Sequence, residues 1–263
     1  MIVAGIKENT RLTVCAIIQA RMGSERLPGK VLMEIEGKPI LEHIIDRLQT
    51  SKMVNSIIVA TTSKKKDKPI VRLAEKCCVD YFIGSEEDVL ERYVKAAEKS
   101  GANTIIRVTS DNPLIDITSL DYMIKVHIDE QLDYTFNVND SGRHVYSDGI
   151  VIGLGTEVVS AVALKKACVL AKEGYQREHV TIFIEEHPEL FKIRHIGAPR
   201  ALQNSKLRLT VDTVEDLELM RKIYSKFYKR TKFVDCIKAI KFLEENGALL
   251  KINSHIKQKG LPK

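Results

Sequence analysis

Residues 16–30 read AIIQARMGSERLPGK, an apolar run followed by a loop that holds two glycines, a proline and three cations, Arg21, Arg26 and Lys30. Glycine reaches backbone conformations that are closed to other residues, so the amide groups of such a loop can approach and cradle an anion. Arginine and lysine add positive charge, and the fork of a guanidinium group suits phosphate oxygens. We therefore predict that this loop binds a polyphosphate.

The loop matches neither of the two better-known phosphate-binding motifs. Five residues separate Gly23 from Gly29, whereas the Walker motif has four at this place, and Val31 follows Lys30 where that motif has Ser or Thr. The dinucleotide fingerprint GxGxxG is also absent. An ordinary solvated turn at Pro28-Gly29 is the alternative. Ligand binding is favoured because open α/β sheets bind ligands just beyond the carboxyl ends of their strands.

The rest of the chain alternates between strand and helix patterns. Helical patterns begin at Pro39, between Asp67 and Pro69, and near Val89. This alternation predicts an α/β fold in which helices flank a mostly parallel sheet. Apolar runs of strand length occupy residues 13–19, 56–61, 81–83, 104–108, 134–137, 192–196 and 207–211.

We predict a single domain over residues 1–263, with two segments that depart from the alternation. Residues 140–156 contain several glycines and extended stretches, and we interpret them as an inserted hairpin or a dimerisation segment. Residues 252–263 are polar and basic, which is typical of a flexible tail.

Composition narrows the class of protein. With 263 residues, of which 44% are hydrophobic, the chain can bury a large core. The net charge of +6 favours anionic ligands, while the absence of Trp and the 6% aromatic content argue against a base-stacking surface. The five cysteines are scattered, and no apolar stretch approaches the roughly 20 residues of a membrane span. We expect a cytoplasmic protein that binds neither nucleic acid nor a membrane.

Two aspartates follow predicted strands that are distant in sequence. Asp111 comes after residues 104–108, and Asp212 directly follows residues 207–211, so both belong at one edge of the sheet. Two carboxylates about 4 Å apart repel by roughly 4 kcal/mol at an effective dielectric constant near 20. Such a pair beside a polyphosphate predicts a bound Mg²⁺ ion, which prefers oxygen ligands. The alternatives are structural: Asp212 as a helix cap, and Asp111 as part of the Asn112-Pro113 turn.

Five segments together resemble the cytidylyltransferases that make CMP-activated sugar acids, especially the spore coat polysaccharide biosynthesis protein F type and, next, the 3-deoxy-manno-octulosonate cytidylyltransferases. This resemblance implies a GT-A-like, Rossmann-like fold, the substrate CTP, Mg²⁺ as cofactor, and a homodimer formed through the inserted segment. The segments are ARMGSERLPGKVL (20–32), IVATTS (58–63), GSEEDVLERY (84–93), RVTSDNPLID (107–116) and LRLTVDTVEDLELMRKIY (207–224).

The resemblance also implies roles for individual residues. Arg21, Lys30, Asp111 and Asp212 would be catalytic, and the two aspartates would hold the metal. The chain departs from its relatives at Val31, where sialic acid synthetases have Asn, and at Ser110, where the octulosonate enzymes have Gly. The residues implied in nucleotide binding are Ala20, Arg21, Gly23, Ser24, Arg26, Lys30, Thr61, Ser85, Asp88 and Asp111.

The middle third of the chain contains basic residues suited to an anionic acceptor. We predict that Arg143, Arg177 and His179 bind it, and that Arg177-Glu178-His179 opens a helix. The match to either sugar-acid enzyme is poor between Asp116 and Leu207. The acceptor therefore remains open between a sugar acid and a phosphomonoester.

These features lead to one hypothesis and two alternatives. The hypothesis is transfer of CMP from CTP to a small anionic acceptor, with release of pyrophosphate. One alternative is a nucleotide-sugar-dependent glycosyltransferase of the same fold, although such enzymes usually carry Asp-x-Asp where this chain has Ser110-Asp111-Asn112. The other is a nucleotide-binding protein without catalytic activity.

Overall fold

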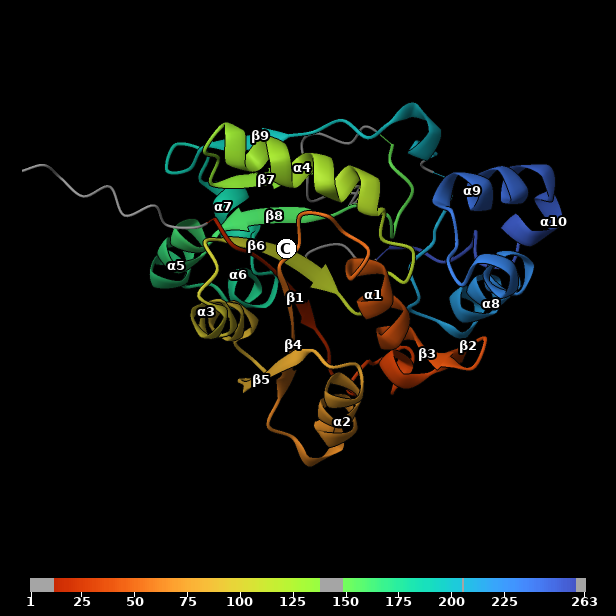
Figure 1. Cartoon of the computed structure of the whole chain (residues 1–263), viewed down its shortest axis with the longest axis horizontal. Coiled ribbons are helices and arrows are strands. Elements are labelled where there is room, and N and C mark those ends of the chain that lie inside the picture. Colours follow the sequence, from red (N-terminus) through yellow and green to blue (C-terminus); the bar gives the residue numbers. More distant parts are fainter. Residues whose placement is uncertain (1–11, 138–148, 205, 259–263) are drawn as a thin grey trace, which may run out of the picture.

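The computed structural model describes residues 12–137, 149–204 and 206–258. Its main sheet has seven strands in the order β5-β4-β1-β6-β8-β7-β9 (Figure 1). Strands β5, β4, β1 and β6 are parallel, whereas β8 runs antiparallel to both of its neighbours. The predicted mostly parallel sheet is confirmed. The strands are β1 (Val14–Gln19), β4 (Ser56–Thr62), β5 (Asp80–Gly84), β6 (Thr104–Thr109), β7 (Tyr134–Phe136), β8 (Glu157–Ser160) and β9 (Ile193–His195).

Helices cover both faces of the sheet because successive residues of a strand point to opposite sides. In β1, Ala16 and Ile18 belong to one buried cluster, while Cys15 and Ile17 belong to the other. The first cluster includes residues of α1 (Ile40–Leu48), α2 (Lys68–Lys76) and α4 (Ile117–Asp129). The second includes residues of α3 (Val89–Ser100), α5 (Ala161–Leu170) and α7 (Ile182–Glu186).

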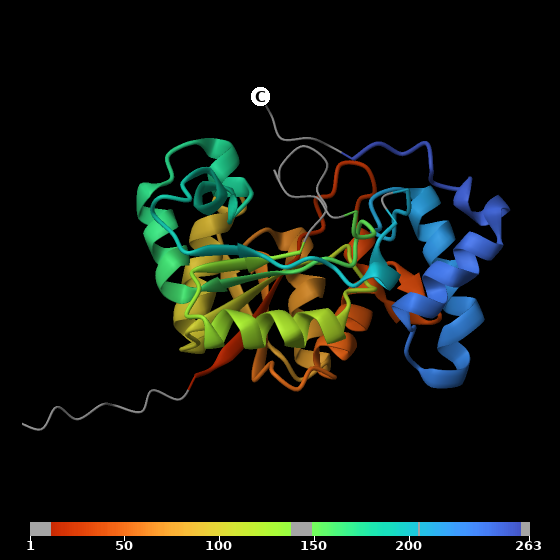
Figure 2. The ribbon, with the colours of Figure 1, turned by 90° about the horizontal axis from the view of Figure 1, so that it is seen from above.

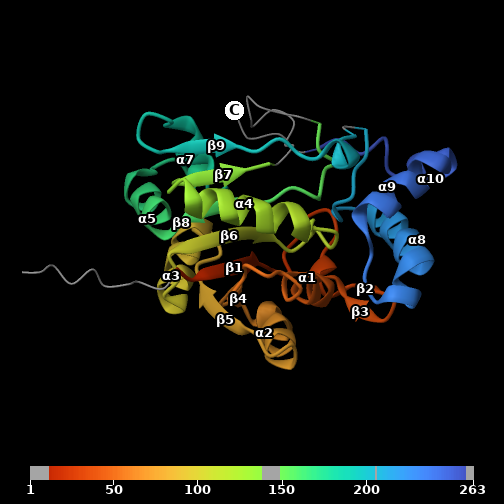
Figure 3. The same cartoon turned by 45° about the horizontal axis from the view of Figure 1, so that its top comes forward.

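The last helices gather at one end of the molecule. Figure 3 shows α8 (Val214–Thr231), α9 (Cys236–Glu245) and α10 (Gly247–Leu250) beside α1 and the short strands β2 (Glu34–Ile35) and β3 (Lys38–Pro39). Arg47 of α1 is 4% exposed and donates to the carbonyls of Ile115 (3.0 Å) and Val234 (2.8 Å). Buried side chains of α8 and α9 share one cluster with α1, so these helices extend the core of the sheet domain.

The helix starts predicted at Pro39, between Asp67 and Pro69, and near Val89 are confirmed, but one capping role is different. Helix α1 begins directly after Pro39, and Asp88 caps α3 by accepting a hydrogen bond from the Glu91 amide at 2.9 Å. The carboxylate of Asp67 does not cap α2; it accepts from the Met22 amide at 2.7 Å and from the hydroxyl of Thr62. Asp67 therefore fixes the start of the loop that follows β1.

The prediction of a sheet strand at residues 207–211 is wrong, although the chain there is extended. Arg208 makes an isolated bridge with Ile152, and Leu209 donates to the Ile152 carbonyl at 2.7 Å. The partner is a short segment around Gly153 rather than a strand of the sheet. A Cβ on Gly153 would lie 2.6 Å from the carbonyl carbon of Leu209, so the close approach needs glycine.

The two segments that interrupt the alternation also differ from expectation where they are described. Within 149–156, Ile150 and Leu154 are buried and Val151 donates to the Leu202 carbonyl at 2.9 Å, so this part does not project as a hairpin. Residues 138–148, which include Arg143, lie outside the described residues. In the expected tail, Asn253 is 4% exposed and hydrogen-bonded, so residues 252–258 pack against the domain.

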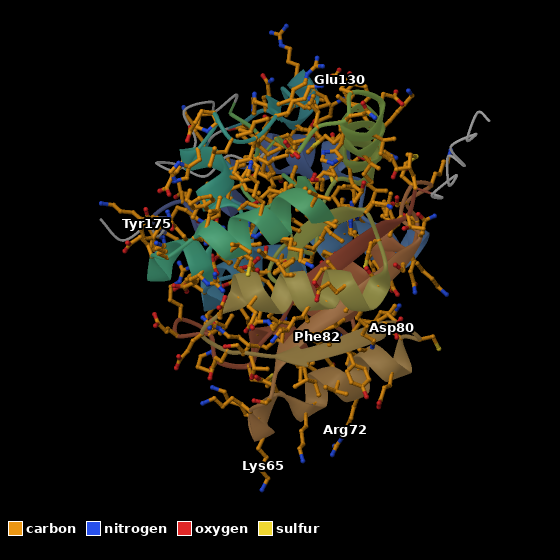
Figure 4. All side chains as sticks on the ribbon, turned by 90° about the vertical axis from the view of Figure 1, so that its left-hand side faces the viewer. Lys65, Arg72, Asp80, Phe82, Glu130 and Tyr175 are labelled. Atoms are coloured by element: carbon orange, nitrogen blue, oxygen red, sulfur yellow. The ribbon has the colours of Figure 1, made fainter. Side chains whose placement is uncertain are left out.

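The outer surface carries ordinary solvated charge. Figure 4 shows Lys65, Arg72 and Glu130 extending outward from the body of the protein. Glu130 pairs there with the exposed Arg194. Among the helices of residues 12–137, 149–204 and 206–258, none has the length and apolar character that crossing a bilayer requires.

Candidate active site

The loop after β1 is held in shape by Gly29. Its φ of 73° lies in the left-handed region, and its amide donates to the Met22 carbonyl at 3.0 Å. The short helix η1 (Lys30–Leu32) follows directly. Gly23 does not use this conformational freedom; a Cβ there would meet the ends of two side chains, 2.8 Å from Lys66 Nζ and 3.7 Å from Glu86 Oε1. The prediction that both glycines shape the loop holds for Gly29 alone.

Lys30 brings the two predicted aspartates together. Its Nζ donates to Asp111 Oδ2 at 3.0 Å, to Asp212 Oδ1 at 2.7 Å and to the Val211 carbonyl at 2.8 Å. Asp111 follows the carboxyl end of β6, and Asp212 follows the extended segment that pairs with Ile152. The Val211 amide donates to the Asp111 carbonyl at 2.8 Å, which aligns the two turns. The predicted convergence of loop and aspartates is confirmed.

Asp212 faces cations rather than capping a helix. Its Oδ2 lies 2.9 Å from Arg26 Nη2 and 2.5 Å from Arg208 Nη2. The cap of α8 is Thr213, whose hydroxyl accepts from the Asp216 amide at 3.3 Å. The capping alternative for Asp212 is therefore wrong, and its carboxylate is directed toward the loop.

Charge coupling keeps both Lys30 and Asp212 ionised. Burial disfavours the charge on Lys30, but Asp111 and Asp212 together outweigh that effect and raise its pKa. Burial likewise disfavours the Asp212 carboxylate, yet Lys30, Arg26 and Arg208 lower its pKa. The site therefore holds a compact set of opposite charges at neutral pH.

Two cavities meet at these residues. The first, which we call the loop cavity, measures about 320 Å³ and is lined by the loop after β1 and by the end of β6. The second, which we call the tail cavity, measures about 160 Å³ and is lined by Gly153, Gly155, Thr156 and Gln258 among others. The wall that the two cavities share contains Arg107, Thr109, Asp111 and Asp212. A group placed at this wall is accessible from both sides.

Some predicted nucleotide-binding residues line the loop cavity and others do not. Gly23, Thr61, Ser85 and Asp88 line neither cavity. Thr61 is fully buried, and the Ser85 hydroxyl accepts from the Asp88 amide at 3.0 Å, which shapes the start of α3. Those in the lining are Ala20, Arg21, Ser24, Arg26, Lys30 and Asp111.

The predicted acceptor residues are separated from one another. His179 lines the loop cavity, whereas the guanidinium of Arg177 pairs with Asp88 and lines neither cavity. The prediction that Arg177-Glu178-His179 opens a helix is wrong, because α6 (Gly174–Glu178) ends there. Val180, with a φ of 60°, separates α6 from α7, a conformation that costs a β-branched residue free energy.

Several lining residues carry signals that sequence reasoning passed over. Arg107 is a charge within the apolar strand β6, a pattern that indicates a buried ion pair or a ligand; its Nη1 donates to Glu157. Gln19 Oε1, Arg92 Nε and Arg107 Nε are buried without a hydrogen-bond partner among the described residues. All three side chains line the loop cavity, which therefore offers both donors and an acceptor to a ligand.

The two carboxylates have the ligand chemistry that a divalent cation takes. Asp111 Oδ2 and Asp212 Oδ1 both lie within 3.0 Å of Lys30 Nζ, so they converge on one positively charged atom. Oxygen ligands of this kind suit Mg²⁺, which usually takes one or two carboxylates and completes its shell with phosphate oxygens and water. The part of the chain that the structure describes contains no group of three or more His, Cys, Asp or Glu side chains placed to hold a metal.

The fold and the site define a nucleotidyltransferase of the Rossmann-like class, and comparisons with known proteins give the family. The sequence profile described as Cytidylyltransferase matches residues 15–251. This chain belongs to the cytidylyltransferase family, so the resemblance described above is confirmed.

Two relatives and one solved structure show how far the similarity extends. An uncharacterised protein of Methanocaldococcus jannaschii, MJ1063, is 40% identical and covers 94% of this chain and 97% of its own. The spore coat polysaccharide biosynthesis protein SpsF of Bacillus subtilis is 37% identical over 81% of this chain and 87% of its own. A cytidylyltransferase structure from Leptospira borgpetersenii serovar Hardjo-bovis is 32% identical, with a TM-score of 0.83 over 91% of this chain and 97% of that one.

Proposed function

We propose that this protein transfers CMP from CTP to a small anionic acceptor, a sugar acid or a phosphomonoester, and releases pyrophosphate. The observation that carries the proposal is the contact of Lys30 with both Asp111 and Asp212 at the wall between two cavities. The loop cavity, with its cations, would hold the nucleoside triphosphate. The tail cavity would hold the acceptor on the opposite side of the same carboxylates.

Each residue has a distinct task in the proposed reaction. Arg21, Arg26 and Lys30 bind the triphosphate and offset its charge as the acceptor oxygen attacks the α-phosphorus. The bond from the α-phosphorus to the oxygen shared with the β-phosphate breaks, and pyrophosphate leaves with that electron pair. Asp111 and Asp212 would hold Mg²⁺, which supplies further neutralisation of the phosphates when bound.

The nature of the acceptor decides whether a base is needed. A hydroxyl nucleophile must lose its proton during attack, whereas an ionised phosphate needs no such help. Groups in the described lining of the loop cavity that could accept this proton include His179, Asp111 and Asp212. Most of the rate enhancement then comes from positioning and charge stabilisation.

The proposal extends to the setting of the enzyme. The relative SpsF is named for spore coat polysaccharide biosynthesis, which supports a role in polysaccharide biosynthesis for this chain as well. We also propose that the enzyme is located in the cytoplasm, where CTP is made. We further propose that it forms a homodimer through the segment around residues 140–156. Light scattering coupled to gel filtration tests the dimer directly.

Detection of pyrophosphate tests the reaction itself. The protein is incubated with Mg²⁺, each of the four nucleoside triphosphates and three acceptors: 3-deoxy-manno-octulosonate, N-acetylneuraminate and glycerol 3-phosphate. We expect acceptor-dependent release with CTP and little with ATP, GTP or UTP. A variant of the surface residue Asp129, Asp129→Asn, is the control and should match the wild type, because Asp129 pairs with the exposed Lys125 away from the site. No pyrophosphate from CTP with any acceptor, while a sugar nucleotide is consumed, would favour the glycosyltransferase.

A further inference from the structure

The chain after α10 returns to the site instead of leaving it. Figure 2 shows this segment turning back from the last helices toward the middle of the molecule. Its residues 252–258 lie beyond residue 251, where the match to the family profile ends. Contacts made by this segment therefore come from outside the part of the chain that the family match covers.

Asn253 anchors the segment to the network behind Asp212. Its buried amide donates to the Arg208 carbonyl at 3.0 Å and to Asp216 Oδ1 at 2.8 Å. Asp216, 1% exposed, accepts from the Asp212 amide at 3.0 Å, and Arg208 donates to the Asp212 carboxylate. Two short chains of hydrogen bonds thus connect Asn253 to Asp212, one through Arg208 and one through Asp216.

Gln258 brings the end of the segment into the tail cavity. Its Oε1 accepts from Arg208 Nη1, and this contact fixes the orientation of the amide. The Nε2 group is then the part left to donate, and no hydrogen-bond partner for it exists among the described residues. Gln258 therefore presents a hydrogen-bond donor to whatever occupies the cavity.

Asn112 supplies the matching acceptor on the same lining. The Thr109 hydroxyl donates to Asp111 at 2.6 Å, so it accepts from Asn112 Nδ2 at 2.9 Å, and this orients the amide. Asn112 Oδ1 is left buried without a partner among the described residues. A donor and an acceptor that line one cavity are the complement of a hydroxyl group, which both donates and accepts.

We propose that Gln258, together with Asn112, determines acceptor specificity by binding an acceptor hydroxyl in the tail cavity, and that Asn253 is the positioning residue that holds this segment and Asp212 in place. The proposal rests on the proposed function, since it assigns the tail cavity to the acceptor. It adds to the site a residue that lies beyond the part of the chain matched by the family profile.

Three substitutions at two positions test the acceptor contact. Gln258→Ala removes both contacts of the amide, whereas Gln258→Glu keeps an oxygen for Arg208, replaces the donor by a second acceptor and adds a negative charge. We expect both variants to raise the acceptor KM by about tenfold or more, because a site built to hydrogen-bond a hydroxyl is left unpaired, with the KM for CTP within about twofold of wild type. Lys257→Ala, an exposed neighbour, is the control and should leave both KM values unchanged. A purely structural role predicts that Gln258→Glu behaves as wild type, and that result would overturn the proposal.

A binding experiment tests the positioning role without any acceptor. Calorimetry measures the affinity for CTP with and without Mg²⁺ in Asn253→Ala and in the exposed control Ser254→Ala. In the wild type, Mg²⁺ should increase the affinity for CTP. We expect this increase to be about tenfold smaller in Asn253→Ala and unchanged in Ser254→Ala. Equal gains in both variants would overturn the role of Asn253; if Asn253→Ala does not fold, the Gln258 variants decide.

The two proposals fail in distinguishable ways. If the wild type releases no pyrophosphate from CTP with any of the three acceptors, the proposed function is wrong, whereas the calorimetric comparison still decides whether Asn253 acts on Asp212. If the wild type is active and the Gln258 variants have unchanged acceptor KM values, only the role of the C-terminal segment is wrong.

Discussion

The loop cavity and the tail cavity share one wall but differ in charge. Besides the shared Arg107, the described lining of the loop cavity holds four further cations, Arg21, Arg26, Lys30 and Arg92. Arg107 is the only cation in the described lining of the tail cavity, apart from any contribution of undescribed residues, and it is paired with Glu157. Cations therefore predominate in the loop cavity, whereas the described lining of the tail cavity combines three carboxylates, Asp111, Glu157 and Asp212, with neutral amides such as those of Asn112 and Gln258.

The shared wall is where a single change has the largest effect. Asp212→Asn or Asp111→Asn removes one carboxylate on which both cavities depend, and we expect pyrophosphate release to fall by about 10³-fold or more, because metal and charge stabilisation supply several kcal/mol. The measurement is the rate with CTP and the most active acceptor, with Asp129→Asn as the surface control. Circular dichroism should show the fold retained. Wild-type activity in both variants would contradict the metal site.

Lys30→Met tests the loop cavity, because Lys30 lines that cavity and not the tail cavity. Lys30 is the cation that contacts both aspartates, so its loss leaves two carboxylates facing each other and one positive charge fewer for the triphosphate. We expect kcat/KM for CTP to fall by about 10²-fold, the typical cost of removing one preorganised charge contact. Lys38→Met is the matched control, since Lys38 pairs with Glu42 and Asp46 at the surface. An unchanged acceptor KM in Lys30→Met would support the assignment of CTP to the loop cavity and of the acceptor to the tail cavity.

The two sides of the site also differed in how well the sequence predicted them. The loop after β1 and Asp111 directly follow strands, so local periodicity was enough to place them at one sheet edge. The tail cavity depends on contacts without a local signal. Arg208 is hydrogen-bonded to Asn253 and Gln258, which are 45 and 50 residues away in the sequence. No sequence periodicity indicates contacts of this kind.

The errors in the prediction have the same physical origin. Residues 207–211 read as a strand because they are apolar and extended, but their partner is the glycine-containing segment near Ile152. Residues 252–258 read as a flexible tail because they are polar, whereas a buried amide at Asn253 satisfies two distant oxygens. In both places tertiary hydrogen bonds decided the structure, and composition alone carries no information about them.

Gly153→Ala tests the packing that forms the tail cavity. The residue has a φ of 97°, and an added Cβ would lie 2.6 Å from the Leu209 backbone. Gly37→Ala is the matched control, because Gly37 has a φ of 76° and nothing within 4 Å of the added atom. We expect Gly153→Ala to lower the free energy of unfolding by about 2 kcal/mol more than Gly37→Ala, since overpacking adds to backbone strain. Urea unfolding measures the difference, and equal losses would contradict the close approach.

Acid should produce the smallest effect, by weakening the half of the sheet that supports the tail cavity. Buried His127 of α4 meets the Thr135 hydroxyl of β7, and β7 pairs with β8, whose Glu157 lines that cavity. Burial lowers the pKa of His127 from 6.5 to about 4, although Asp133 opposes the shift. The unfolded chain therefore binds the proton more tightly, and stability is lost as the pH falls below about 6.5. Between pH 7 and pH 5.5 the loss from this group is about 1 kcal/mol.

Urea unfolding at the two pH values measures this loss, and His127→Gln separates it from other titrations. The variant cannot take up the proton, so its free energy of unfolding should fall by about 1 kcal/mol less than that of the wild type over this range. His187→Gln, in which the replaced ring lies at the surface, should keep the wild-type dependence. If the free energy of unfolding depends on pH in the same way in His127→Gln and in the wild type, protonation of His127 does not account for the loss of stability in acid.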